Sequence, residues 1–141
     1  MKRSIYGALI LLAAALMISV PMVQAQSQVK ADVPFAFSVD KQSMPAGNYE
    51  IRSLSEKVLV MRNLDTGQAW LMMKPHDVQA SRIQNAKLVF HKCDDQYFLS
   101  QIWNGSSDTG MEFVTSRREK ELQMAGNSLP NEPELVIVAM K

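Results

Sequence analysis

The sequence predicts an all-β domain, an antiparallel sandwich or small barrel of about seven strands with one short helix near the C-terminus. Seven short segments with alternating or continuous apolar residues follow one another at close spacing. Clusters of Asp, Gly, Ser, Asn and Pro separate most of them, as in turns, and one later segment carries a helix start signal. This spacing fits both a sandwich and a barrel, so both architectures stay open.

The N-terminal residues predict export. A basic start, Met1–Arg3, precedes the apolar run of residues 5–20, and Val23–Ala25 fits the pattern that a signal peptidase cleaves. Pro21 interrupts the run before the roughly 20 apolar residues that a membrane span needs, so we expect no transmembrane anchor after cleavage. We therefore predict a signal peptide over residues 1–25 and a periplasmic or extracellular protein.

The mature chain, residues 26–141, is predicted to be a single β-rich domain. Loss of Lys2 and Arg3 with the signal peptide changes the formal net charge from +1 to −1. Nucleic-acid binding depends on positive charge, so nucleic acid is not an expected partner.

The first half of the domain is predicted to be a meander. We expect strands at residues 29–39, 47–54, 57–63 and 68–73. Pro34 removes a backbone donor from the first segment, which suits an edge or a bulge. Residues 40–47 (DKQSMPAG) form a turn cluster, and residues 74–85 have no sustained period and are predicted to be a loop.

The segment LVFHKCDDQYFLSQIW predicts a hairpin with strands at residues 87–93 and 97–104. If Asp94 and Asp95 form a two-residue loop, Cys93 pairs with Gln96. The predicted core face comprises Leu88, Phe90, Tyr97, Leu99 and Trp103. The predicted opposite face comprises Val89, His91, Cys93, Phe98 and Ile102. Because that second face is half apolar, we expect it to be partly covered.

A helix is predicted over residues 117–125. Ser116 and Glu119 have the spacing of a capping box, and Gly126 suits the helix end. Its charged RREKE run is interpreted as a solvated face. The last apolar run, residues 135–140, predicts a strand inside a sheet that could close against an early strand.

Two stretches, VPFAFSVDKQSMPAGNYEI and KLVFHKCDDQYFLSQIW, resemble a group of small exported bacterial β-rich proteins of unknown function. The shared layout is PFxF, then PAGxY, then LVFxxxxxxYFL, and the resemblance runs from Val33 to about Gln123. It implies the fold and the export, and it supplies no catalytic residue, ligand or partner. MPAGNYEI also resembles a turn-and-strand element of exported sandwich modules, in which Gly47 permits the turn and Tyr49 packs inward.

No catalytic site is predicted. The sequence contains no GxSxG, HExxH or CxxC motif and no glycine-rich phosphate loop. His76 and Asp77 lie together in a predicted loop, but no nucleophile accompanies them. Asp94 and Asp95 are adjacent acids that turn propensity already explains. We therefore expect a protein that is not an enzyme and that needs no cofactor.

His91 and Cys93 are the one speculative metal pair. Residues two apart on a strand face the same side, so the imidazole and the thiolate could share a copper or zinc ion with a methionine. Structural zinc takes four ligands, and the sequence specifies no third one, so we predict no metal site and favour hairpin packing. Cys93 is expected to be buried, whereas an exposed Cys93 would allow an intermolecular disulfide.

Two functions remain open. The favoured one is a binding or structural module of the periplasm or cell surface, which contacts an envelope protein or a glycan through residues 74–85 and 104–110. The alternative is a small barrel that carries an apolar small molecule. Its candidate lining residues are Trp70, Trp103, Tyr97, Phe98 and the methionines. An apolar interior cavity of about 300 to 1,000 Å³ would favour this alternative.

Overall fold

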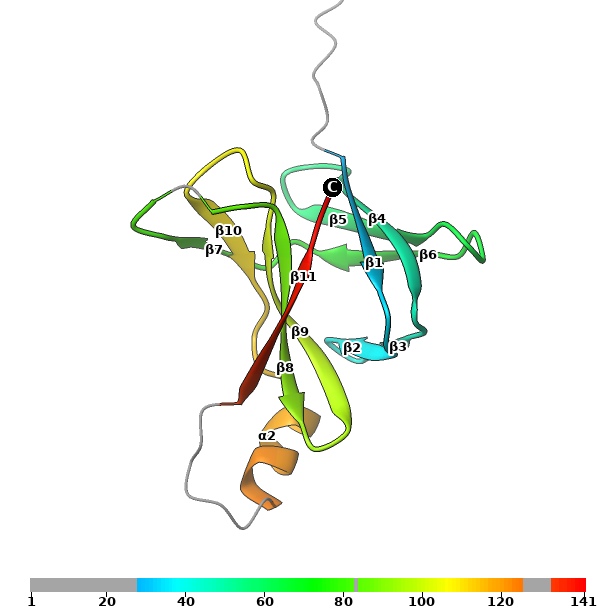
Figure 1. Cartoon of the computed structure of the whole chain (residues 1–141), viewed down its shortest axis with the longest axis vertical. Helices are drawn as coiled ribbons and strands as arrows, with labels where there is room; N and C mark the ends of the chain where they lie inside the picture. Colours follow the sequence, from blue (N-terminus) through cyan, green and yellow to red (C-terminus); the bar gives the residue numbers. More distant parts are fainter. Residues whose placement is uncertain (1–27, 83, 126–132) are drawn as a thin grey trace, which may run out of the picture.

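The computed structural model describes residues 28–82, 84–125 and 133–141, which form a mostly β structure with one helix (Figure 1). The strands are β1 (Val29–Val33), β2 (Phe37–Val39), β3 (Gln42–Met44), β4 (Gly47–Ser53), β5 (Val58–Asn63), β6 (Ala69–Met73), β7 (His76–Gln79), β8 (Lys87–Cys93), β9 (Gln96–Trp103), β10 (Thr109–Glu112) and β11 (Glu134–Ala139). Helix α2 spans Arg117–Ala125, as predicted. The all-β prediction is confirmed, and the predicted signal peptide, residues 1–25, lies outside the described residues.

The strands form two sheets that share one core. One sheet has the order β1-β4-β5-β6, and the other has the order β11-β8-β9-β10-β7, with β2 paired to β9 and β3 to β2. At one corner, Lys30 and Lys141 exchange backbone hydrogen bonds of 2.9 and 3.1 Å, and Ala31 bridges to Met140 (Figure 1). The described strands form no other link between the sheets, so the architecture is an open sandwich and not a closed barrel.

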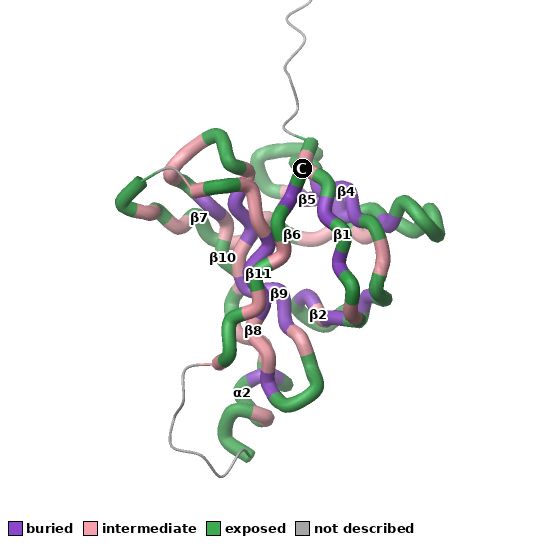
Figure 2. The backbone as a smooth tube through the Cα atoms, in the orientation of Figure 1, coloured by how far each residue is buried: buried purple, intermediate pink, exposed green. Residues whose placement is uncertain are grey.

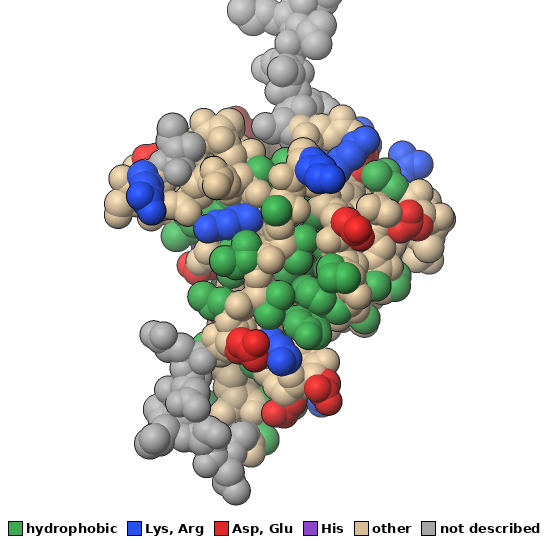
Figure 3. Space-filling model, viewed as in Figure 1, with side chains coloured by type: hydrophobic (Ala, Val, Ile, Leu, Met, Phe, Trp, Pro, Cys, Tyr) green, Lys and Arg blue, Asp and Glu red, His purple; other side chains and the backbone are tan. Residues whose placement is uncertain are grey.

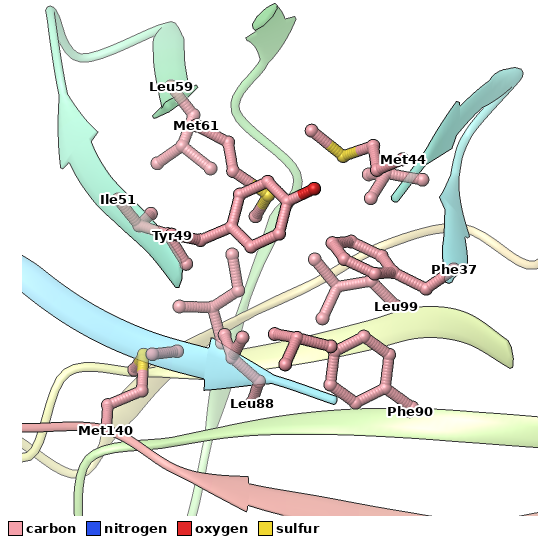
Figure 4. Close-up of a cluster of buried hydrophobic side chains, with 14 residues drawn as sticks. Phe37, Met44, Tyr49, Ile51, Leu59, Met61, Leu88, Phe90, Leu99 and Met140 are labelled. Carbon is pink, nitrogen blue, oxygen red and sulfur yellow. The ribbon is translucent and has the colours of Figure 1, made fainter. Parts of the chain in front are cut away.

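Side chains from both sheets fill the interior (Figure 4). The labelled members of this cluster are Phe37, Met44, Tyr49, Ile51, Leu59, Met61, Leu88, Phe90, Leu99 and Met140. Phe90 is completely buried and meets the rings of Phe35 and Phe37 edge-on, with both centroid separations at 5.2 Å. Tyr49 is also completely buried, as predicted. Figure 2 shows in purple that strands of both sheets carry buried positions.

The predicted first strand is in fact two strands, and Pro34 stands at the break. β1 ends at Val33 in one sheet, and β2 begins at Phe37 in the other. Proline has no N–H to donate to a ladder, so the chain leaves the first sheet here. β1 lies at a sheet edge, as predicted, and β4, β5 and β6 match the next three predicted strands within one residue at each end.

Three short strands were not predicted. One is β10, which begins at Thr109 inside the predicted loop of residues 104–110. The other two lie wholly where turns or loops were predicted. β3 falls inside the predicted turn cluster, and β7 falls inside the predicted loop of residues 74–85. Their sequences, QSM and HDVQ, are too short and polar to show a strand period. Pairing with β2 and β10, respectively, makes them strands, so tertiary contacts override the local pattern.

The β8–β9 hairpin has the predicted two-residue loop, and Cys93 pairs with Gln96. Asp94 adopts a positive φ of 52°, a turn conformation that Asp tolerates. The predicted faces are wrong beyond Leu99, because Phe90 pairs with Leu99 whereas Val89 pairs with Gln101. The register therefore shifts by one residue at Ser100.

This bulge exchanges the positions of Ile102 and Trp103. Ile102 pairs with Leu88 and joins the core cluster, whereas Trp103 lies outside that cluster. The Trp103 ring instead covers Gly110, where an added Cβ would lie 2.7 Å from the ring. A one-residue slip moves each following side chain to the other face of a strand, which explains the exchange.

β11 is an edge strand, and the prediction that it lies inside a sheet is wrong. It pairs with β8 on one side, and the chain end meets the early strand β1 through the Ala31–Met140 bridge. Leu135 and Ile137 are consequently 60% and 59% exposed. In Figure 3, hydrophobic side chains gather in the middle of the face around β11, with charged groups around them.

Candidate functional site

The outer face of the second sheet brings the speculative metal pair next to helix α2. Nδ1 of His91 lies 2.6 Å from Oε1 of Glu119. Nε2 of Gln123 donates to the same Glu119 oxygen at 3.4 Å and to Sγ of Cys93 at 3.9 Å. Glu119 and Gln123, one turn apart on α2, therefore hold the helix against β8.

The buried position of Glu119 corrects two predictions. The Ser116 hydroxyl accepts the Glu119 N–H at 3.2 Å, as in a capping box. The Glu119 carboxylate, however, contacts His91 across the helix–sheet boundary and Gln123 one turn along the helix. The RREKE run is also not wholly solvated, because the Glu119 side chain is 5% exposed whereas that of Arg117 is 94% exposed. Glu119 is the buried residue of α2, and Figure 2 shows most of the helix exposed.

The His91, Cys93 and Glu119 side chains do not form an activated thiol. The Cys93 sulfur accepts a hydrogen bond from Gln123, and no hydrogen bond joins Cys93 to His91 among the described side chains. Burial raises the pKa of the Cys93 thiol above its ordinary value, against a smaller lowering by the Gln123 contact. A protonated thiol is a poor nucleophile and a poor metal ligand. Over residues 28–82, 84–125 and 133–141, no three His, Cys, Asp or Glu side chains are placed to share a metal ion.

We predict that His91→Ala loosens α2 and exposes Cys93. The substitution leaves the buried Glu119 carboxylate without its imidazole partner, and an unsatisfied buried polar group costs about 1 to 3 kcal/mol. The thiol should then react with a disulfide reagent about tenfold faster than in the wild-type protein at neutral pH. Lys92→Ala, which removes the more exposed pair with Glu134, is the matched control and should leave the rate unchanged. Equal rates in the wild-type protein and His91→Ala would show that α2 does not cover the thiol.

The other two predicted polar pairs lie on β7 and in the loop of the β8–β9 hairpin. His76 and Asp77 both lie on β7 and are exposed, and Asp77 pairs with Lys74 at 3.1 Å. Successive strand residues point to opposite faces, so Asp77 does not orient the imidazole. Asp94 and Asp95 form the loop of the β8–β9 hairpin.

The aromatic residues proposed to line an apolar cavity are used in packing. Trp70 and Tyr97 pack against the core, whereas Phe98 and Trp103 are buried outside that cluster. A hollow of about 220 Å³ reaches the core residues Ile51, Leu59 and Ile102 beneath a polar rim. None of the four aromatic residues lines it, and its volume is below the predicted range for an apolar ligand.

A larger groove lies at the surface along β6, with a volume of about 440 Å³. Its lining residues are Val39, Asp40, Gln42, Leu71, Met72, Met73, Lys74, Pro75, His76, Phe113 and Val114. Leu71, Met73 and Val114 are exposed by 62%, 74% and 68%. Exposed apolar side chains gathered beside a groove are typical of a binding surface.

The backbone of β6 is open on the side away from β5. The N–H of Lys74 bonds to Lys57, and the carbonyl of Gln68 accepts from Asn63, so even-numbered residues of this stretch direct their backbone groups to β5. In an antiparallel ladder the alternate residues direct theirs outward, so those of Leu71 and Met73 point away from β5. β6 is the last strand of its sheet among the described residues.

The described part of the chain has no helix with the length and apolarity of a membrane span. No protein-family model, curated protein or solved structure matches this chain. The strand at residues 68–73 is predictable from the sequence, but its position at the end of a sheet beside a groove is not. The one feature of the sequence that could have indicated this site is that the predicted strand contains no charged residue and no proline.

Proposed function

We propose that the protein is an exported, non-enzymatic binding module of the periplasm or cell surface, and that its partner occupies the groove along β6. The observation that carries this proposal is the groove itself, because three strongly exposed apolar side chains line it. The free energy of the protein is lowered when a partner covers apolar surface of this kind and removes it from water. Export is supported by the signal-peptide pattern of residues 1–25.

The groove favours an apolar part of an envelope protein over a glycan, since its lining is largely aliphatic. The proposed contact surface is therefore this groove and not the loops at residues 74–85 and 104–110 that the sequence suggested. Residues 74–76 are common to both, because they line the groove. The alternative, an apolar small molecule inside the sandwich, is less well supported because side chains fill the core.

A neutral apolar dye, N-phenylnaphthylamine, tests whether the groove binds apolar groups. We expect its fluorescence to rise on binding and its affinity to fall about tenfold in Val114→Lys, which places a charge at the groove wall. Leu135→Lys is the matched control, because Leu135 is similarly exposed on β11 and does not line the groove. Equal weakening by both variants, or no binding to the wild-type protein, would contradict a groove-specific function.

A further inference from the structure

We propose that the partner of the β6 groove is an extended polypeptide segment that adds to the first sheet as a new strand beside β6. This inference rests on the proposed function of the groove and specifies its occupant. Three features carry it: the open backbone edge, the absence of the usual edge protections and the charges along the groove.

The open backbone edge lies where the groove lies. Leu71 and Met73 line the groove, and they are the residues whose backbone N–H and carbonyl groups point away from β5. No backbone hydrogen bond from either N–H to another strand occurs among the described residues. An added strand could pair with these groups while its side chains cover the apolar lining, which is the mode of β-strand addition.

β6 also lacks the features that protect the edges formed by β1 and β3. Natural edge strands are commonly protected by charge, proline or extreme shortness. β1 contains Lys30 and Asp32, and β3 has three residues. β6, with the sequence AWLMM, has five residues and neither a charge nor a proline. Its apolar edge is therefore well suited to pair with another strand.

The charges of the groove limit the chemistry of the added segment. Lys74 is paired with Asp77, so its charge is largely compensated. Asp40, the one acidic lining residue, forms no ion pair within the described part of the chain. Charge complementarity therefore favours a segment that is uncharged along β6 and basic near Asp40, and it disfavours an acidic segment.

A capped hexapeptide of alternating valine and threonine, ending in one arginine, is the probe. We expect it to bind the full mature chain, residues 26–141, and to bind Leu71→Pro roughly tenfold more weakly, because proline lacks the outward N–H. The same N–H is not used in the β5 ladder, so Leu71→Pro should keep the fold, which thermal unfolding checks. Leu71→Thr keeps the N–H and should lose less affinity than Leu71→Pro.

Ile137→Pro is the matched control on the other sheet. Ile137 is 59% exposed, and its N–H points away from β8, because the alternate residue Met140 donates to Ala86. This variant should bind the hexapeptide with wild-type affinity. A second form of the peptide with its central valine N-methylated should bind at least about tenfold more weakly.

Undiminished binding of the hexapeptide to Leu71→Pro, or of the N-methylated peptide to the wild-type protein, would overturn strand addition. If the dye then still binds with the predicted sensitivity to Val114→Lys, the groove function stands and strand addition is wrong. If neither the dye nor the hexapeptide binds, both proposals are wrong.

Discussion

Phe90→Ala should lower the free energy of unfolding by about 3 to 5 kcal/mol. Phe90 is completely buried on β8 and packs edge-on against Phe35 and Phe37, so the truncation removes apolar contacts and leaves a cavity between the sheets. Urea denaturation of the chain of residues 26–141 measures the change. A loss below about 1 kcal/mol would contradict the position of Phe90 at the centre of the core.

Leu135→Ala provides the control for this measurement. Leu135 is an exposed apolar residue on the neighbouring strand β11, so its truncation leaves no interior cavity. We expect an effect within about 0.5 kcal/mol. A similar loss of unfolding free energy for both variants would indicate that the loss depends on how much apolar side chain is removed and not on whether that side chain is packed in the interior.

Gly47→Ala should lower the free energy of unfolding by about 2 to 4 kcal/mol. Overpacking by the new methyl group accounts for about 1 to 3 kcal/mol of this loss, and the positive φ accounts for about 1 kcal/mol. Gly47 has a φ of 153°, and an added Cβ would lie 2.8 Å from Oδ2 of Asp65 and 2.9 Å from Nδ2 of Asn63. Oδ2 of Asp65 accepts the Asn48 N–H at 2.7 Å, so movement away from the new methyl weakens that bond. Thermal or urea unfolding measures the loss.

Gly67→Ala separates the two causes. Gly67 also has a positive φ, 75°, but an added Cβ would meet no atom within 4 Å. This variant should therefore lose about 1 kcal/mol, from backbone strain alone. If Gly67→Ala costs as much as Gly47→Ala, the crowding at Asn63 and Asp65 does not contribute.

Much of this fold could be predicted from local patterns. The hairpin loop at Asp94, the helix that follows Ser116 and the strands around Ile51 and Met61 have strong period or capping signals. These signals depend on neighbouring residues, so a single sequence carries them.

The remaining features depend on distant partners. The bulge at Ser100 depends on the pairing of β9 with β8, and the burial of Glu119 depends on where His91 meets the helix. Similarly, nothing in the AWLMM sequence indicates that Leu71 lies at a sheet edge, because sheet order is a property of the whole chain. The candidate groove was missed for this reason.

The β6 edge is tested most directly by amide hydrogen exchange of the chain of residues 26–141, resolved by residue and repeated at saturating hexapeptide. In the free protein we expect slow exchange at Trp70 and Met72, which bond to β5, and fast exchange at Leu71 and Met73, which point outward. On binding, Leu71 and Met73 should slow by about tenfold or more, because their N–H groups gain strand partners. Slow exchange at Leu71 and Met73 in the free protein, or fast exchange there at saturation, would contradict an open edge that receives a strand.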